Sequence, residues 1–303
     1  MSKVFTFDNL ITEYKSSETN SLTSDSLTNL KEQIVEKIKT RKILKSSIHL
    51  LEKELLKDNR RLKRRMFFPF GQKIFNKKII FLQEQINKNE NKISDKKKEL
   101  NNTFISTNVP HNKNIISKFV LLKEAFNKLA QSEFVWDITT SQIINRVKLR
   151  SAASNVIDRK RVNIFFSSVD LIISDEDAFH FQNANGGDIY IYPSMIIIVS
   201  QNKEVALLDY RDIYLNYRET HFVEEEKFPT DSQQVGTTWA KVNKDGSRDR
   251  RFSNNYQIPI ALYGQLHWES KKGFNEVYQF SNSTSTRLFY ETFIEYKNCI
   301  NPN

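Results

Sequence analysis

The stretch Arg64-Arg65-Met66-Phe67-Phe68-Pro69-Phe70-Gly71 lies between two long segments whose apolar residues follow a helical spacing. Proline disfavours helical conformation at the residue before it, Phe68, and Gly71 permits the chain to reverse its direction. We therefore expect one helix to end before Pro69 and a second helix to begin after it.

Apolar residues on both sides of this break recur mostly at steps of three and four, the spacing of one face of a helix. In the first segment they are Leu30, Ile34, Ile38, Leu44, Ile48, Leu51, Leu55 and Leu62. In the second segment they are Phe75, Ile79, Leu82, Ile86, Ile93 and Leu100. Two helices that fold back on each other bury both faces, so the sequence predicts an antiparallel coiled-coil hairpin over residues 24–102. One continuous helix that dimerises through the same residues is the alternative.

Positive charge is concentrated around the break. Residues 31–100 contain 21 Lys and Arg against 9 Asp and Glu, whereas the whole chain has a net charge of +10. From Asn59 to Gln83 there is no acidic residue, and eight cationic side chains form a candidate anion-binding site. They are Arg60, Arg61, Lys63, Arg64, Arg65, Lys73, Lys77 and Lys78. Charge that is segregated in this way favours a local anionic partner.

Aromatic residues are interleaved with these cations. Phe67, Phe68, Phe70 and Phe75 form the predicted aromatic tip of the hairpin. Exposed rings and cations together can bind a membrane, because rings enter the headgroup region while cations hold lipid phosphates. They can equally bind a nucleic acid through base stacking and phosphate contacts, and we favour nucleic acid slightly over membrane. The alternatives are that the rings pack on the rest of the chain or on a partner protein.

The rest of the chain divides into three regions. Residues 1–23 include a Ser/Thr-rich stretch with little periodicity and predict a flexible lead-in. Residues 103–158 predict a helical connector, with one helix over about 115–129 and a short helix over 140–155. Residues 159–303 predict a β-rich module with a C-terminal helix. The predicted fold class is therefore α+β.

Strands are expected in the last region where β-branched and aromatic residues form short runs between turn-forming residues. These runs cover 162–166, 188–199, 204–208, 212–217, 257–263 and 276–280, and a final helix begins at Ser283. The first four runs predict a meander. Six or seven antiparallel strands followed by a helix is the order of a pleckstrin-homology-like barrel, and by analogy we expect such a module, which binds lipid headgroups or peptides.

A second notable segment combines Trp239, Asn243-Lys244-Asp245-Gly246, Asp249-Arg250-Arg251-Phe252, Ile258-Pro259 and Tyr263-Gly264. It resembles a run found in uncharacterised bacterial proteins, where the run also lies in a C-terminal β-rich portion. The resemblance covers roughly residues 183–282 and does not reach the predicted hairpin. It implies no activity and no functional residue.

Within this segment Arg250 and Arg251, with Tyr263, form a candidate ligand clamp, because two arginines can hold an anion through paired hydrogen bonds. The alternative is that Asp249 binds the adjacent arginines in a local network that fixes the loop. Nearby acidic residues have the oxygen ligands of a divalent cation, but their spacing matches no known loop, so we expect a solvated charge run and no metal. They are Glu224, Glu225, Glu226, Asp231, Asp245 and Asp249.

The sequence assembles no complete catalytic or cofactor-binding pattern. The five histidines are scattered singly, and Cys299 is the single cysteine, which leaves no cysteine-based zinc site. A metal-dependent nuclease would follow an acid such as Asp188 with Glu-x-Lys, and Glu204-Val205-Ala206 lacks the lysine. We therefore expect no cofactor, and we favour a non-enzymatic protein over an enzyme.

The favoured hypothesis is a binding or scaffold protein whose basic aromatic tip contacts an anionic partner and whose β-rich module binds a protein or small ligand. The alternatives are a nucleic-acid-processing factor with a degenerate nuclease site, and a peripheral membrane protein anchored by the Phe-rich tip. The sequence shows no secretion signal or membrane-spanning stretch, so we expect a cytoplasmic location or a peripheral one at the inner face of the membrane. The oligomeric state is left open.

Overall fold

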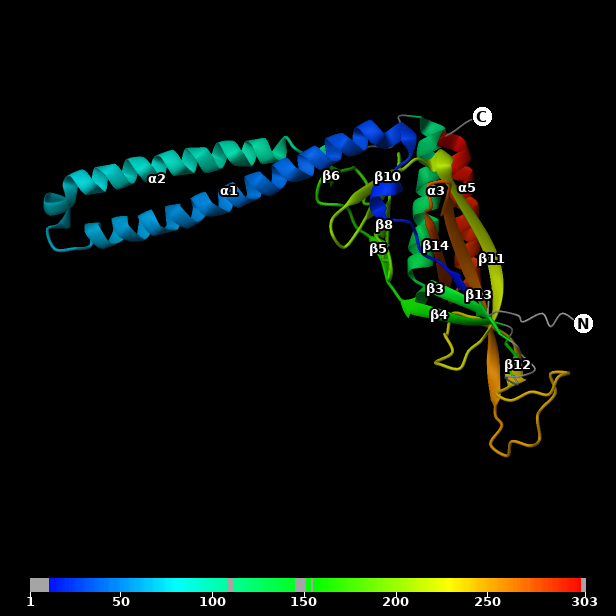
Figure 1. Cartoon of the computed structure of the whole chain (residues 1–303). Coiled ribbons are helices and arrows are strands. Elements are labelled where there is room, and N and C mark those ends of the chain that lie inside the picture. Colours follow the sequence, from blue (N-terminus) through cyan, green and yellow to red (C-terminus); the bar gives the residue numbers. More distant parts are fainter. Residues whose placement is uncertain (1–10, 108–111, 145–150, 154, 301–303) are drawn as a thin grey trace, which may run out of the picture. The chain divides into compact units, whose positions relative to one another are not determined.

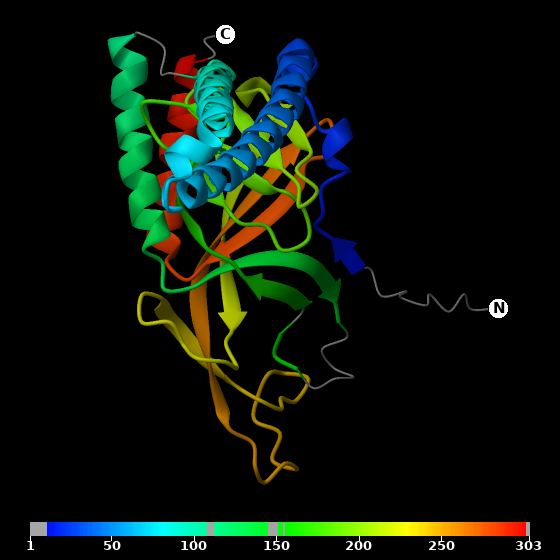
Figure 2. The ribbon, with the colours of Figure 1, turned by 90° about the vertical axis from the view of Figure 1, so that its left-hand side faces the viewer.

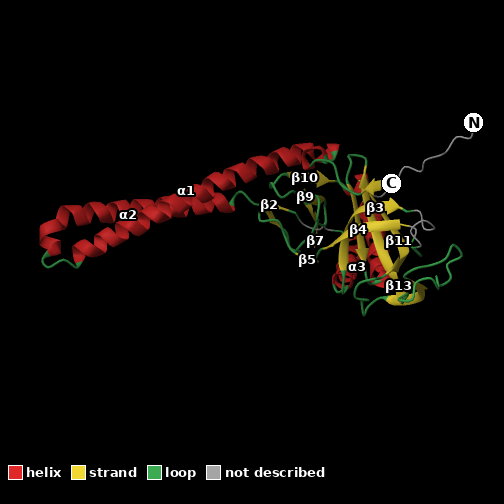
Figure 3. Cartoon of the chain, turned by 60° about the horizontal axis from the view of Figure 1, so that its bottom comes forward, coloured by secondary structure: helices red, strands yellow, loops and turns green. Residues whose placement is uncertain are grey.

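The computed structural model of the chain describes residues 11–107, 112–144, 151–153 and 155–300. It shows an α+β protein with a pair of long helices, several β-sheets and a C-terminal helix (Figure 1; Figure 3 colours helices red and strands yellow). Contacts divide the chain into two compact units. The first, the β-rich unit, is formed by Met1–Lys31, Thr107–Val169 and Ser174–Asn303, and the second, the helical unit, is formed by Glu32–Ser106 and Asp170–Ile173.

The two long helices are α1 (Thr28–Met66) and α2 (Gly71–Asn101), and they run side by side in blue and cyan in Figure 1. The helical hairpin that the sequence predicts is therefore confirmed, with the reversal at Pro69. The predicted apolar residues are buried or half-buried in both helices. The most buried of them are Ile34, Leu44, Ile48, Ile79, Leu82, Ile86 and Ile93. The two apolar faces thus lie against each other and away from water, which stabilises both helices.

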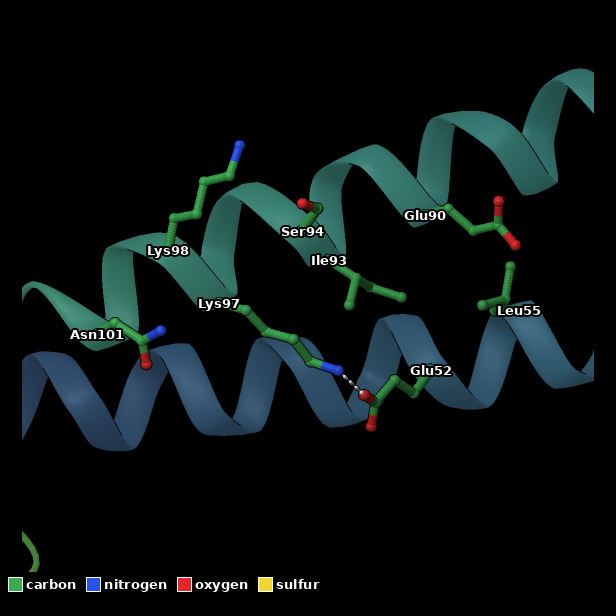
Figure 4. Close-up of a pocket in the computed structure, with 8 residues that line it drawn as sticks. All are labelled: Glu52, Leu55, Glu90, Ile93, Ser94, Lys97, Lys98 and Asn101. Carbon is green, nitrogen blue, oxygen red and sulfur yellow. Dashed lines mark ion pairs between the residues drawn. The ribbon is translucent and has the colours of Figure 1, made fainter.

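Polar contacts show that the helices are antiparallel. Arg41 donates hydrogen bonds to the carbonyl of Leu100, at 3.2 Å, and to Oγ1 of Thr103, at 2.8 Å. Further along, Lys97 Nζ lies 2.9 Å from Glu52 Oε1, across a hollow between the helices (Figure 4). Residues late in α2 therefore lie beside residues in the first half and middle of α1. After α2, β2 (Ile105–Ser106) pairs in parallel with β6 (Ile172–Ile173) and completes the helical unit.

The larger sheet of the β-rich unit has seven strands, and all neighbouring strands in it are antiparallel. Its main path has the order β1-β3-β14-β13-β11, while β12 also pairs with β13 and β4 pairs with β3. The strands are β1 (Ile11–Glu13), β3 (Val135–Ile143), β4 (Asn155–Arg161), β11 (Ile213–Val223), β12 (Gln233–Trp239), β13 (Gln257–Ser270) and β14 (Asn275–Phe280).

The second sheet of this unit has five strands in the order β10-β9-β8-β7-β5. They are β5 (Ile164–Phe166), β7 (Phe179–Phe181), β8 (Asp188–Ile191), β9 (Ile196–Val199) and β10 (Val205–Leu208). Each strand pairs with the next one in the chain apart from β6, so this part is a meander. Its strands differ from the expected runs, because 188–199 forms two strands, β8 and β9, and β7 was not expected. The run expected over 212–217 belongs instead to β11 of the larger sheet, because it continues into a long strand that pairs with β13 over its whole length.

Two helices of this unit pack against the sheets through large aromatic side chains. They are α3 (Lys113–Ala130) and α5 (Ser283–Ile300), which lie side by side in green and red in Figure 2. The ring centroid of Phe126 on α3 lies 4.6 Å from that of Phe179 and 6.1 Å from that of Phe289 on α5. All three rings are fully buried. Burial of such large rings removes much apolar surface from water and stabilises this unit.

The expected helical connector over 103–158 is only partly helical. The helix expected over about 115–129 is present as α3. The prediction of a short helix over 140–155 is wrong, because both ends of that range form strands. Residues 140–143 continue β3 and residue 155 begins β4, whereas 145–150 and 154 lie outside the described residues. The β-branched residues of β3 favour an extended chain, and pairing with β14 and β4 fixes it.

The expected flexible lead-in over 1–23 also differs from the structure where the chain is described. Residues 1–10 lie outside the described residues, but β1 pairs with β3, and Leu22 is buried in the core of the β-rich unit. Ser24, just beyond the lead-in, donates its backbone N–H to the carbonyl of Leu207 at 2.9 Å. These partners are distant in the sequence, so the local composition of the segment did not reveal them.

Gly264 on β13 offers a test of how closely α5 approaches the sheet. A Cβ at this position would lie 2.4 Å from Cβ and Oγ1 of Thr286, which is fully buried and bonded through its hydroxyl to the carbonyl of Asn282. Gly264→Ala should therefore lower the free energy of unfolding by about 1–3 kcal/mol, as measured by urea denaturation. Gly236→Ala in β12 is the control, since its nearest neighbour would be Ile260 Cδ1 at 3.8 Å. Equal unfolding midpoints for the two variants would contradict the close approach.

Candidate functional site

The tip of the helical hairpin, residues 60–78, is built around a short reversal between α1 and α2. Phe67 continues the hydrogen bonding of α1 by donating its N–H to the carbonyl of Lys63 at 3.0 Å. Phe70 precedes α2 in the left-handed conformation, with φ of 56°. This conformation is rare for a residue with a bulky side chain, and it lets the chain turn back within four residues. The reversal places the side chains of 66–70 at the end of the hairpin.

The aromatic tip is exposed, except for one ring. The exposed fractions of Phe67 and Phe70 are 86% and 78%, and Phe68 is also exposed. Phe75 is half-buried and makes an edge contact with Phe68, with ring centroids 5.9 Å apart. The interpretation in which these rings pack inside the chain therefore does not apply to Phe67, Phe68 and Phe70. Two aliphatic side chains, Met66 and Ile74, are exposed beside them.

The tip cations, as we call the eight residues of the candidate anion-binding site, lie in the last turns of α1 and the first turns of α2, on both sides of the reversal. Arg65 is half-buried and the other seven are exposed. Arg61 forms an ion pair with Asp58 Oδ1 at 3.0 Å. Within the described part of the chain, no other tip cation has a carboxylate within ion-pair distance. The tip therefore carries positive charge that carboxylates of the described residues leave largely uncompensated.

The first turn of α2 adds hydrogen-bond donors to the same end of the hairpin. The N-cap residue, Phe70, has no polar side chain, and no side-chain hydrogen bond caps this helix. The first backbone N–H groups of a helix have no partner within the helix and carry partial positive charge. Together with the tip cations they form a surface suited to phosphate groups.

The candidate ligand clamp is only partly brought together. Arg251 forms a bidentate ion pair with the buried carboxylate of Asp249, with nitrogen–oxygen distances of 2.9 and 2.8 Å. Arg250 is exposed and lines a shallow hollow together with Arg248 and Arg251. Tyr263 does not line this hollow. It is buried in β13, and its hydroxyl donates a 2.6 Å hydrogen bond to Glu224 Oε2.

Glu224, expected in a solvated charge run, is buried in an ion pair that the sequence did not indicate. Arg159 on β4 donates hydrogen bonds of 3.0 and 2.8 Å to both of its carboxylate oxygens. The guanidinium lies between two rings, with Cζ 4.0 Å from the centroid of Trp136 and 4.1 Å from that of Phe222. The partners come from distant parts of the chain, which is why local composition gave no signal.

Two buried carboxyl groups, Asp137 on β3 and Glu276 on β14, form a second unexpected polar cluster. Asp137 Oδ2 accepts a 2.8 Å hydrogen bond from the backbone N–H of Ala184, and Glu276 Oε1 accepts from both the N–H and the hydroxyl of Ser16. Burial raises the pKa of Asp137 to about 6 and that of Glu276 to about 7. The second carboxylate oxygen of Asp137 is buried and has no hydrogen-bond partner in the described structure.

The acids considered for a nuclease site bind other partners. Asp188 Oδ2 lies 3.0 Å from Nε2 of His180, and Glu204 Oε1 accepts a hydrogen bond from the side chain of Asn20. The described residues contain no group of three or more His, Cys, Asp or Glu side chains placed to hold a metal ion.

Comparisons of the chain with protein-family models, curated proteins and solved structures find no match. The resemblance of residues 183–282 to bacterial proteins therefore stays a prediction. Among the described residues, no helix combines the length and the apolar character that crossing a bilayer requires.

Proposed function

We propose that the chain is a binding protein that uses the tip of its helical hairpin to hold an anionic partner. The observation that carries this proposal is the exposure of the tip cations, seven of them without a carboxylate partner in the described structure, around exposed phenylalanines. Bringing so many like charges together raises the free energy of the unbound protein. An anionic partner removes that repulsion, and the exposed rings add apolar contact area.

The pairing of α1 and α2 is proposed to follow coiled-coil geometry, which would keep the tip stiff and far from the open end of the hairpin. The spacing of the buried residues by three and four supports this, as does the Glu52–Lys97 ion pair across the helices. At the open end, Arg41 lies over the ring of Phe104 at 4.2 Å and donates hydrogen bonds to Leu100, in the last turn of α2, and to Thr103, just after it. A stiff hairpin presents its tip with little loss of conformational entropy on binding.

The β-rich unit is proposed to bind a protein or a small ligand. The hollow beside Arg248, Arg250 and Arg251 supports an anionic group as the ligand, since Arg250 is exposed there. Asp249 holds Arg251 and so fixes the wall of the hollow. A pleckstrin-homology-like module remains the fold proposal for this unit, supported by its antiparallel strands and C-terminal helix.

Neutralising three tip cations tests the proposed function. Arg61, Arg64 and Arg65 changed together to Gln should lower the salt concentration at which the protein elutes from heparin, because each lost charge removes one contact with an anionic group. The control is Lys42, Lys88 and Lys92 changed to Gln, which removes the same charge from exposed positions elsewhere on the two helices. If both triple variants elute together, or if the wild type is not retained, the tip is not an anion-binding site.

A further inference from the structure

We propose that the anionic partner of the tip is the surface of a lipid bilayer, into which the aromatic end of the hairpin inserts. This inference rests on the proposed function and names the class of partner. It is carried by the chemistry of the exposed apolar side chains, by their position relative to the tip cations, and by the conformation of Phe70.

The exposed apolar side chains of the tip are not all aromatic. Ile74 is 61% exposed and Met66 is 44% exposed, beside Phe67 and Phe70. A nucleic acid binds flat aromatic rings, because its bases stack on them. Neither isoleucine nor methionine has a ring on which a base can stack. Insertion into a bilayer lowers the free energy of all four side chains, since each leaves water for the apolar boundary beneath the headgroups. The composition of the tip therefore favours lipid.

The positions of the cations fit the depth of an interfacial insertion. Arg60 is six residues before Met66 in α1, so at the helical rise it lies about 9 Å behind the end of that helix. Lys78 is seven residues into α2, about 10 Å behind its start. Apolar groups of interfacial segments enter roughly 5–10 Å into the headgroup boundary. With the hairpin end-on, Arg60 and Lys78 then lie level with the lipid phosphates, where basic residues attract anionic lipids. Arg64, Arg65 and Lys73 lie within about 3 Å of the helix ends, and their long side chains can extend back to the same phosphates.

The conformation of Phe70 supports a role for its exposed ring. Its positive φ is a conformation that glycine adopts readily and a bulky residue rarely does. The residue gains little burial in return, because it is 78% exposed. A partner that buries the ring supplies favourable free energy that offsets the cost of this backbone conformation. The start of α2, which no side-chain cap covers, follows Phe70 directly and carries partial positive charge that favours a lipid phosphate there.

Vesicle flotation tests the proposal with the full chain. Wild type should float with vesicles of phosphatidylcholine and phosphatidylglycerol, and much less with phosphatidylcholine alone. Phe67 and Phe70 changed together to Ser should lower the partition coefficient by about tenfold or more, since two rings no longer leave water. The matched control changes Ile43 and Leu50 to Ser, which are exposed apolar residues of α1 away from the tip. This control should bind like wild type.

Fluorescence anisotropy with labelled single-stranded DNA and RNA separates the outcomes. Binding to nucleic acid, lost in the variant of Arg61, Arg64 and Arg65, with no flotation would overturn the lipid inference and leave the proposed function standing. Flotation that is unchanged by loss of Phe67 and Phe70, or that falls equally in the Ile43 and Leu50 control, would overturn insertion at the tip. No binding to vesicles, nucleic acid or heparin would overturn both proposals.

Discussion

Replacing Glu224 with alanine is expected to lower the free energy of unfolding by about 3–5 kcal/mol, because removal of one member of a buried ion pair leaves the other charge without compensation. The carboxylate of Glu224 is almost fully buried, and so is the guanidinium of Arg159. In the variant that guanidinium would remain between the rings of Trp136 and Phe222, with neutral polar neighbours such as the side chain of Gln279, at 3.3 Å, and no carboxylate.

The ion pair also organises the chain around it. Glu224 accepts hydrogen bonds from the hydroxyl of Tyr263 at 2.6 Å and from the backbone N–H of Glu226 at 3.0 Å. Its own N–H donates to the carbonyl of Pro259. Burial and the bond to Glu224 hold the pKa of Tyr263 far above its usual range, so the tyrosine stays a donor. Loss of the carboxylate therefore leaves several buried donors unpaired at once.

Urea denaturation of the β-rich unit, followed by tryptophan fluorescence, measures the effect. The control is Glu225→Ala, which removes an exposed carboxylate from the next residue and should change stability by less than about 0.5 kcal/mol. A double variant, Arg159→Met with Glu224→Leu, should recover much of the loss, because no buried charge remains. A Glu224→Ala variant as stable as the control would show that the pair is solvated.

The helical hairpin could be predicted because its determinants are local. The apolar residues of α1 and α2 are spaced by three and four over many turns, and Pro69 marks the break by its own covalent structure. The concentration of the tip cations is likewise visible in the sequence. The exposure of a side chain depends on the three-dimensional path of the chain. Whether Phe67 or Phe75 faces water therefore depends on the turn at Phe70, which the sequence pattern does not specify.

The sheets were predicted less completely because their determinants are long-range. The strand β3 was missed, since Thr140 to Ile143 have no clear alternation of apolar and polar residues. The lead-in was expected to be flexible because it is rich in Ser and Thr. In the structure, Ser16 bonds to Glu276, which is 260 residues away. No short-range pattern records such a contact, and the same applies to the buried pair of Arg159 and Glu224.

The free energy of unfolding is also expected to fall as the pH rises from about 4 to about 8, because of Asp137 and Glu276. Burial raises the pKa of Asp137 from 3.8 to about 6. Burial, and then the nearby charge of Asp137, raise the pKa of Glu276 from 4.5 to about 7. Below the unfolded pKa values, both states hold these protons and pH has no effect. Above them the unfolded chain releases its protons first, so each rise in pH favours unfolding until the folded groups have titrated.

Neutral variants of the same shape isolate this contribution. Asp137→Asn and Glu276→Gln keep a carbonyl oxygen to accept the bonds from Ala184 and Ser16 but have no charge to bury. Each should raise the free energy of unfolding at pH 8 by up to roughly 3 kcal/mol, the value of a shift of slightly more than two pKa units, and change it little near pH 4. The double variant should gain less than the sum of the two single gains. Each single variant already removes the repulsion between the two charges, so the double variant cannot remove it twice.

The free energy of unfolding of each variant is compared with that of wild type at the same pH. This is needed because other titratable groups change the stability in the opposite direction as the pH rises. The hydrogen bond from Lys227, with two from Thr230, lowers the pKa of Glu133 to about 2, so that group stabilises the fold above its unfolded pKa. Asp175→Asn, at an exposed position of the β-rich unit, serves as the control and should follow wild type throughout. Parallel stability curves for wild type and Glu276→Gln between pH 4 and pH 8 would show that the carboxyl of Glu276 titrates alike in the folded and unfolded chain. In that case its burial imposes no penalty on the ionised form.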